Sequence, residues 1–387
     1  MKVTGLRTQP YKVKMNRFIA DANNPVGMDE MALLAVFLET DQGVTGHALS
    51  SPGVASTIHS MVEALIIDQD PRAVQGLWEN MVDYVFKGGQ VGTANAALSA
   101  IDAALWDIKS KLNNEPLWKT LGATEPKVRA YASGIDMCLS DEEIYQCYAN
   151  FAKRGVFIGK LKVGLDLEAD VRRIGIMHQA LATSGKRPRL LIDSNEYWSA
   201  KQAIQNISHF EKHFDLFWVE EPTRRWDYKG LRSISKAVKA AVATGENLQQ
   251  LSDFKLLIEN EAVDIVQCGL GAGGVTGALK VANLAYAFEL PFSLMNSPGN
   301  YIAPLATAMP NHIMKEVLEV GLDKGLKIDS YVEDGWIILG NKPGFGLDFD
   351  ETEVAAMEQA YWNTPPQQMP RLWGRRQGAG LLEVPPL

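Results

Sequence analysis

Two lysines, Lys160 and Lys162, stand in an otherwise apolar stretch, FIGKLKVGL (157–165). In a β-strand, residues two apart point to the same face, so the two ammonium groups would lie side by side. Carboxylates end the next three strand-like segments, LIDSN, WVEEP and TGEN, at Asp193, Glu220 and Glu246. Such a set can carry proton transfer or metal binding if the fold brings its members together.

The spacing of the three carboxylates predicts that they converge. Asp193 and Glu220 lie 27 positions apart and Glu220 and Glu246 lie 26 apart, so each step is one strand–helix unit. In a barrel of parallel strands the chemistry lies at the C-terminal strand ends. Converging carboxylates repel one another unless a cation joins them, and oxygen ligands suit Mg²⁺. Pairing with Lys or Arg, or capping of the following helices, is the alternative.

Lys160 and Lys162 could then take part in proton transfer beside the predicted metal site. A metal-bound carboxylate substrate carries a C–H next to its carboxyl group, and removal of that proton gives an enediolate that Mg²⁺ stabilises. The base must be neutral near pH 7. Lys162 meets this condition if Lys160 and the metal ion lower its pKa. The alternative is that one or both lysines reach to solvent.

The chain from about residue 126 to 324 alternates strand-like and helix-like segments. Eight strands are predicted, with one helical segment between each pair: 128–134, 158–164, 189–195, 216–222, 241–247, 264–270, 291–297 and 315–321. This period is typical of a (β/α)8 barrel. An open doubly wound sheet is the alternative, but it usually has fewer strands and often a glycine-rich loop after the first.

The flanking regions differ from the barrel. Residues 1–125 predict antiparallel strands, with a DQG turn at 41–43, followed by the amphipathic helix ALSAIDAALWDIKSKL (97–112), which together form an α+β unit before the barrel. Residues 325–387 predict short strands and turns that pack back on this unit. The whole is therefore expected to be an α/β protein in which an α+β unit precedes a barrel.

Composition excludes some classes of partner. The 387 residues carry a net charge of −8, which argues against nucleic acid and anionic membranes, because both demand a basic face. No apolar run approaches a membrane span, and the N-terminus lacks the apolar core of a signal peptide. The three cysteines have no metal-type spacing. A reduced, cytoplasmic location is the simplest interpretation.

The motifs KLK, LIDSN, WVEEP and ATGEN, in this order and after SAIDAALWDIKSK, resemble the enolase superfamily in its mandelate racemase-like branch, over about residues 1–350. The resemblance implies a modified (β/α)7β barrel capped by an α+β domain from both termini. It also implies the known superfamily chemistry, a Lys or His base with Mg²⁺. By position, the carboxylates resemble the Mg²⁺ ligands, Lys162 the base and Lys160 its partner. Asn195 resembles a polar contact to substrate or metal-bound water.

The sequence departs from the family pattern on the later strands. Racemising members, and many sugar-acid dehydratases, carry an Asp ending the sixth strand and a His ending the seventh. Gly269 stands at the first position, and Asn296, or Ser297 after a one-residue shift, at the second. None of the six histidines ends a predicted barrel strand. Two-base racemisation is therefore disfavoured, because the second proton donor is missing.

The resemblance also suggests further substrate contacts. The eighth strand offers Glu316 or Glu319, and the spacing after Pro310 favours Glu316 as the group that hydrogen-bonds the substrate carboxylate in relatives. Specificity in the family comes from capping-domain loops, here 17–28 and 49–56, with His47 among the polar candidates. Relatives are often homo-oligomers.

These inferences predict a Mg²⁺-dependent dehydratase acting on an acid sugar or a related hydroxy acid. In a syn elimination Lys162 takes the α-proton and can return it to the departing β-hydroxyl, while Asn296 positions hydroxyls. A cycloisomerase or one-base epimerase on a related carboxylate or lactone is one alternative. A ligand-binding relic that keeps the metal site and the fold is another.

Overall fold

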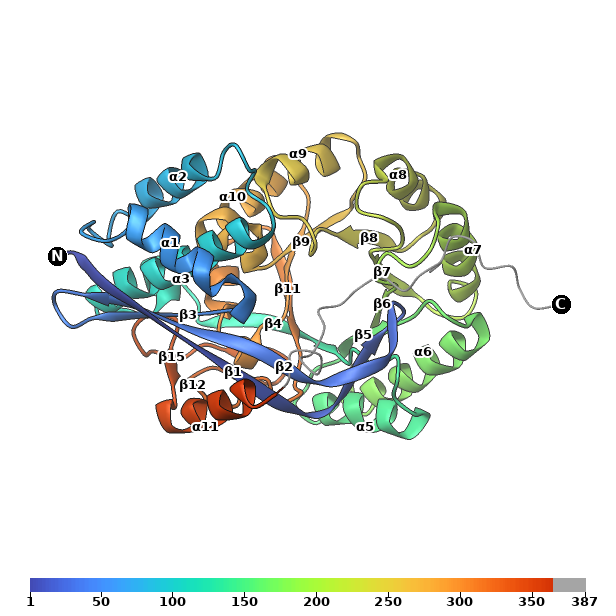
Figure 1. The fold of residues 1–387 in the computed structure, drawn as a ribbon. Coiled ribbons are helices and arrows are strands. Elements are labelled where there is room, and N and C mark those ends of the chain that lie inside the picture. Colours follow the sequence, from blue (N-terminus) through green and yellow to red (C-terminus); the bar gives the residue numbers. More distant parts are fainter. Residues whose placement is uncertain (365–387) are drawn as a thin grey trace.

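A computed structural model gives the arrangement of residues 1–364; the predictions for 365–387 lie outside the described residues. The capping domain contains a three-stranded antiparallel sheet and four α-helices (Figure 1). Its elements are β1 (Val3–Asp21), β2 (Asn24–Thr40), β3 (Thr45–Ser50), α1 (Ala55–Leu65), α2 (Val74–Tyr84), α3 (Gly92–Leu112) and α4 (Leu117–Thr120).

The first two strands are longer than the sequence predicts. Residues 17–28, expected to form a loop, are the end of a β1–β2 hairpin whose turn lies between Asp21 and Asn24. The Asp21 carboxylate accepts hydrogen bonds from the backbone N–H groups of Asn23 (2.8 Å) and Asn24 (2.9 Å), which closes the turn. The hairpin therefore reaches the barrel as ordered sheet.

The barrel prediction is confirmed. Eight parallel strands follow one another around the sheet, and the last pairs with the first to close it. They are β4 (Lys127–Ser133), β5 (Ile158–Lys162), β6 (Arg189–Asp193), β7 (Leu216–Glu220), β8 (Ala241–Thr244), β9 (Ile265–Cys268), β10 (Phe292–Leu294) and β11 (His312–Val317). The eighth strand begins at His312, three residues earlier than expected.

Helices cover the outside of the barrel. They are α5 (Asp141–Ala152), α6 (Leu167–Ala182), α7 (Ala200–Phe210), α8 (Tyr228–Ala237), α9 (Leu251–Glu259) and α10 (Gly274–Ala287). Capping boxes at Ser140 and Ser199 begin α5 and α7 where the sequence changes from strand to helix. The last connection, between β10 and β11, contains the 3₁₀ helices η3 (Pro298–Asn300) and η4 (Ala303–Ala308) in place of an α-helix.

The barrel interior is apolar at one end and charged at the other. The apolar end is a buried cluster that includes Tyr131, Leu191 and Trp218, with the Tyr131 and Trp218 rings in an edge-to-face arrangement 5.2 Å apart. Lys160 lies 5.6 Å from the Tyr131 ring, at the boundary between the two parts. This packed cluster closes one end of the barrel, so a ligand has access only from the other.

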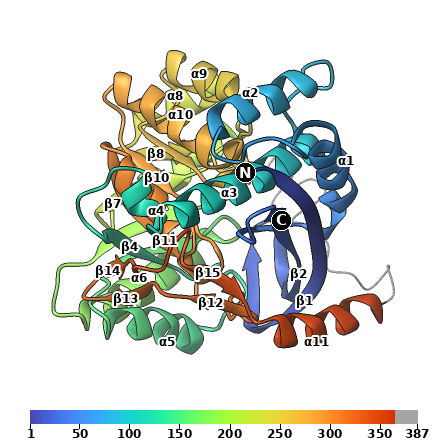
Figure 2. The same ribbon diagram turned by 90° about the vertical axis from the view of Figure 1, so that its left-hand side faces the viewer.

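The C-terminal segment contacts both domains. β12 (Leu326–Ile328) pairs with β15 (Leu347–Phe349), and β13 (Tyr331–Glu333) pairs with β14 (Trp336–Ile338), which extends the barrel sheet beside β4. The last helix, α11 (Glu351–Trp362), lies along β1 (Figure 2), where Gln9 Nε2 donates to Glu358 Oε2 at 2.7 Å. Among residues 1–364, no helix is long and apolar enough to cross a membrane.

Candidate active site

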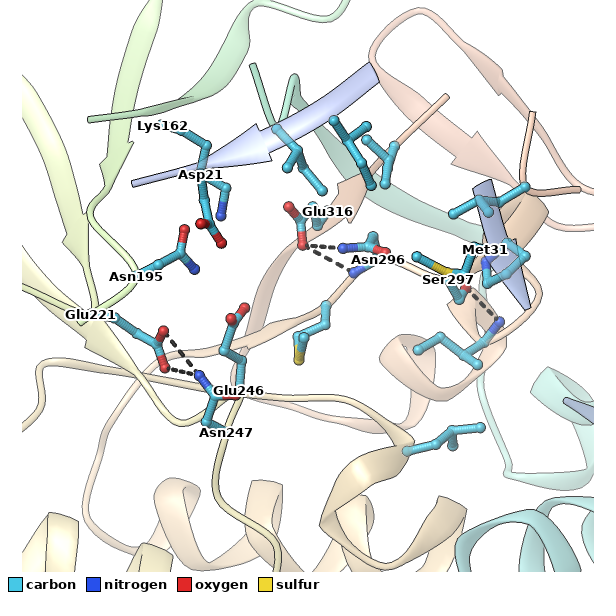
Figure 3. A pocket seen from close by; sticks show the side chains of 18 of the residues that line it. Asp21, Met31, Lys162, Asn195, Glu221, Glu246, Asn247, Asn296, Ser297 and Glu316 are labelled. Carbon is cyan, nitrogen blue, oxygen red and sulfur yellow. Dashed lines mark hydrogen bonds between the residues drawn. The ribbon is translucent and has the colours of Figure 1, made fainter. Parts of the chain in front are cut away.

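A cavity of about 620 Å³ lies where the barrel strands end beneath the capping sheet. Both domains line it: Asp21 and Met31 come from the β1–β2 hairpin, and Lys162, Glu246 and Glu316 come from the barrel. Figure 3 shows Lys162, Asn195 and Glu221 toward one side of this space and Met31 and Ser297 toward the other. Its volume suits a small organic acid.

The two lysines of β5 point toward the same group of carboxylates. Lys162 Nζ lies 2.5 Å from Asp193 Oδ2. Lys160 Nζ lies 2.5 Å from Glu220 Oε1, 3.1 Å from Glu316 Oε1 and 3.4 Å from Asp193 Oδ2. Both lysines are buried, and of the two only Lys162 lines the cavity. Lys160 therefore lies behind it as a shared counter-ion.

The protonation of Lys162 differs from the sequence-based expectation. Burial alone would lower the pKa of this amine, and Lys160 lowers it further, but the carboxylates of Asp193, Glu246 and Glu220 together outweigh both and raise it above its usual range. The pKa of Lys160 is likewise raised, because Glu220 and Glu316 outweigh its burial. Both side chains are ammonium ions here. Lys162 can act as a base only after the charge of Asp193 has been neutralised.

The three predicted metal ligands are brought to one region but do not converge. Asp193 and Glu220 are register partners on β6 and β7, and both face the lysines. Glu246 follows β8 and lines the cavity. In the part of the chain that the structure describes, no three acidic, histidine or cysteine side chains form a metal cluster. The reason is that the carboxylates of Asp193 and Glu220 are directed to Lys160 and Lys162.

The charge balance nevertheless fits a bound cation. Five buried acidic residues and the half-buried Glu246 surround two buried lysines; the five are Asp21, Asp193, Glu220, Glu221 and Glu316. Burial and the nearby Asp193 raise the pKa of Glu246 to about 7, although Lys162 opposes the shift. Gln267 Oε1 and Asn195 Oδ1 are buried with no hydrogen-bond partner among the described residues. A hard divalent ion would relieve this excess of negative charge and use oxygen donors of this kind.

Asn195, Asn296 and Glu316 line the cavity as predicted contacts should. Asn296 donates to Glu316 Oε2 from its side chain at 2.9 Å and from its backbone N–H at 3.1 Å. Burial opposes ionisation of Glu316, but Lys160 and Lys162 lower its pKa to about 2. An ionised Glu316 only accepts hydrogen bonds, so it holds Lys160 and Asn296 and has no proton of its own to donate to a substrate carboxylate.

His47 does not belong to this group. It lies on β3 outside the cavity lining, where its Nδ1 is 3.0 Å from the backbone oxygen of Leu347 and its ring packs between Phe37 and Phe349. The expected substrate contact by His47 therefore lacks support, because the ring is used to join β3 to the C-terminal segment. No histidine of residues 1–364 lines the cavity.

Several lining residues were not predicted from the sequence. Asp21, at the end of β1, is buried, and burial raises the pKa of its carboxyl group despite the charge of Lys162. Glu221, next to Glu220, has a positive φ of 42° and accepts from Asn247 Nδ2 at 2.8 Å. Glu221 could have been predicted from the second acidic residue of the motif WVEEP. Asp21 could have been predicted from the turn-forming residues Asn23 and Asn24 that follow it.

Known protein families match both domains. The family described as "Mandelate racemase / muconate lactonizing enzyme, N-terminal domain" matches residues 19–122. The family described as "Enolase C-terminal domain-like" matches residues 145–353, more than half of the chain. The first match covers most of the capping sheet and its helices, and the second covers the barrel from α5 onward with part of the C-terminal segment.

Individual relatives match over most of the chain. A 3,6-anhydro-alpha-L-galactonate cycloisomerase from Streptomyces coelicolor is 30% identical over 357 residues, covering 89% of this chain and 97% of the relative. An arabinonate dehydratase from Saccharolobus solfataricus is 27% identical, covering 82% and 88%.

Solved structures extend the comparison to the fold. The L-talarate dehydratase from Polaromonas sp. JS666, crystallised with Mg and L-glucarate, superimposes with a TM-score of 0.83 at 27% identity, covering 92% of this chain and 96% of that one. The order of motifs, the capped barrel and these matches agree. The chain belongs to the enolase superfamily, in its mandelate racemase/muconate lactonizing branch.

Proposed function

We propose that this enolase-superfamily carboxylate-processing enzyme is a Mg²⁺-dependent dehydratase of β-hydroxy acids of the acid-sugar class, with Lys162 as its base. The observation that carries the proposal is the placement of Lys162. It is buried, lines the cavity and contacts Asp193 at 2.5 Å, and at the ends of β9 and β10 the chain has Gly269 and Asn296 in place of titrating side chains.

Asp193, Glu220 and Glu246 are the proposed metal ligands. A divalent cation held by these carboxylates would neutralise them and stabilise the negative charge that develops on the substrate's carboxyl group. Lys160 lies outside the cavity lining and acts as a counter-ion for this group of acids, because it contacts Asp193, Glu220 and Glu316. Lys162 lines the cavity, where its amine can reach the carbon next to the substrate's carboxyl group.

The proposed reaction uses one side chain twice. Neutral Lys162 takes the α-proton, the electron pair of that C–H bond forms the C=C bond, and the β C–O bond breaks. The hydroxyl group leaves as water with the proton that Lys162 received, and the enol product tautomerises to a 2-keto acid. Asn296, bonded to Glu316, presents an amide that can orient substrate hydroxyls without taking part in proton transfer.

The test is hydrogen exchange at C2 of acid sugars in D₂O, with product formation followed by mass spectrometry. We expect exchange and formation of a keto acid lighter by one water for at least one acid, with both lost by about 10³-fold in Lys162→Ala. Lys201→Ala, an exposed lysine on α7, is the matched control and should behave as wild type. Unchanged exchange in Lys162→Ala would refute the role of Lys162.

A cycloisomerase is the second candidate, favoured by the 30% identity to the Streptomyces cycloisomerase. It would keep the same proton abstraction and break a ring C–O bond instead of releasing water. The two candidates differ in product mass, which an isomerase leaves unchanged. Exchange with no change of connectivity would indicate a one-base epimerase, and Mg²⁺ binding with no exchange of any acid would indicate a ligand-binding relic.

A further inference from the structure

The cavity wall is divided into a charged part and an apolar part. The loops after β5 to β8 contribute most of the charged groups described above. The capping strands and the loops after β4 and β11 contribute an apolar wall, defined here as Met31, Leu33, Leu49, Ile135, Leu318 and Leu322. Figure 3 shows Met31 on the opposite side of the space from Asn195 and Glu221.

The apolar wall is pre-formed. Leu33 and Leu322 belong to a buried cluster between the capping sheet and the barrel, and the other four members pack against that cluster while remaining partly exposed. Two polar residues that also line the cavity already have partners: Asn296 is bonded to Glu316, and Ser297 Oγ accepts from the backbone N–H of Ile302 at 3.4 Å. A ligand hydroxyl placed against the wall would meet hydrocarbon.

The cations that line the cavity are all engaged. Lys162 contacts Asp193, and Arg225 Nε donates to Glu196 Oε1 at 2.6 Å. Arg224 donates to the backbone oxygens of Trp198 (3.4 Å) and Tyr197 (3.3 Å). Besides the carboxylate that binds beside Lys162, a second substrate carboxylate at the remote end would lie against the apolar wall, with no uncommitted cation among the described lining residues.

We infer that the substrate is a monocarboxylate whose end remote from the reacting carboxyl group is apolar, such as a methyl-terminated acid. The inference rests on the proposed function and deepens it. Aldaric diacids are disfavoured by charge, and a terminal hydroxymethyl group is disfavoured because its hydroxyl would lose its hydrogen bonds to water against the apolar wall. One such group changes kcat/KM by about 10- to 200-fold.

The test compares three acids of identical configuration from C2 to C5, ending in CH₃, CH₂OH or COO⁻, in the galacto, gluco and manno series. We expect kcat/KM for C2 exchange and product formation to be at least about tenfold higher for the CH₃ acid than for the CH₂OH acid, with the diacid lowest. A diacid or CH₂OH acid that equals or exceeds the CH₃ acid overturns the inference. Absence of exchange with every acid overturns the proposed function instead.

Variants locate the preference in the apolar wall. Leu318→Asn and Met31→Gln should each reduce the CH₃/CH₂OH ratio of kcat/KM by about tenfold, while the CH₂OH acid is still turned over. Leu256→Asn, on α9 and 46% exposed, is the matched control and should leave the ratio unchanged. An unchanged ratio in both wall variants, with wild-type thermal unfolding, would show that the wall does not contact the substrate's end.

Discussion

Arg173 and Asp136 form a buried ion pair that holds the backbone of Lys162 from both sides. Arg173 Nη2 lies 3.1 Å from Asp136 Oδ1, which also accepts the backbone N–H of Lys162 at 3.0 Å. Arg173 Nη1 donates to the backbone oxygen of Lys162 at 2.8 Å. Neither residue lines the cavity, so both are positioning residues for the proposed base.

Replacing Arg173 should therefore misplace Lys162. In Arg173→Met we expect kcat to fall by up to about 100-fold with little change in KM, because the base is displaced while the cavity remains. Arg173→Lys should restore part of the loss, since an ammonium can replace only one arm of the planar fork. Steady-state kinetics and C2 exchange measure both effects.

The neighbouring Arg172 provides the matched control. It is exposed and paired with Asp141 at 3.0 Å, so Arg172→Met should retain wild-type kinetics. If Arg173→Met lowered only thermal stability, with kcat and the exchange rate preserved, the pair would have no role in positioning Lys162.

Lys160 should be required for stability of the metal-free protein. It is the common partner of Asp193, Glu220 and Glu316, so Lys160→Met leaves buried carboxylates without their counter-ion and should cost about 3–5 kcal/mol of unfolding free energy. Urea unfolding measures this cost. Lys153→Met, an exposed lysine at the end of α5, should change it by less than about 0.5 kcal/mol.

Adding Mg²⁺ to Lys160→Met tests whether Asp193 and Glu220 bind a metal ion. If Asp193 and Glu220 are metal ligands, millimolar Mg²⁺ should restore part of the stability lost in Lys160→Met, because the cation replaces the missing charge. A loss that Mg²⁺ leaves unchanged would argue against a metal site formed by these two carboxylates.

The stability of the metal-free protein should depend on pH through Glu246. Its pKa is raised by burial from 4.5 to about 7, so the folded protein keeps a proton that the unfolded chain releases between these values. Glu246 should therefore lower the unfolding free energy as pH rises from about 5 to 7, by at most about 1.4 kcal/mol per pH unit. Asp102, with a pKa of about 7, and Asp170, with a pKa of about 6, add to the same slope. Urea unfolding at a series of pH values measures this slope.

Glu246→Gln should reduce that slope by up to about 1.4 kcal/mol per pH unit, because the amide does not titrate, and saturating Mg²⁺ should reduce it similarly in the wild type by holding Glu246 ionised. Glu63→Gln, at an exposed position on α1, is the control and should keep the wild-type slope. A slope that is unchanged in Glu246→Gln would contradict the contribution of Glu246.

The amino-acid pattern was sufficient to predict the barrel and to place the acidic residues at the C-terminal ends of its strands. Each carboxylate ends an apolar run of a regular strand–helix period, so the period alone places Asp193 and Glu220 as neighbours. The sign of the Lys162 pKa shift could not be predicted in this way. It depends on the 2.5 Å contact with Asp193, and the strand period fixes which side a residue faces but not which side chain it touches.

The sequence pattern also did not reveal which distant segments contribute residues to the site. Asp21 and Met31 reach the cavity only because the β1–β2 hairpin extends over the barrel, and the Arg173–Asp136 pair joins α6 to the loop after β4. His47 shows the converse error. Its polar side chain in a capping strand suggested a substrate contact, but its position along β3 places it against Phe349.

The attachment of the hairpin has a consequence for how such enzymes diverge. The hairpin is joined to the barrel in part through backbone groups: Ala20 N–H donates to the Ile135 oxygen at 2.9 Å and Met137 N–H donates to the Ala20 oxygen at 3.1 Å. Backbone bonds do not depend on the identity of the side chains. Substitutions at Met31, which is only partly buried, can therefore accumulate during evolution, or be introduced by a protein engineer, while these backbone bonds keep the hairpin on the barrel that performs the chemistry.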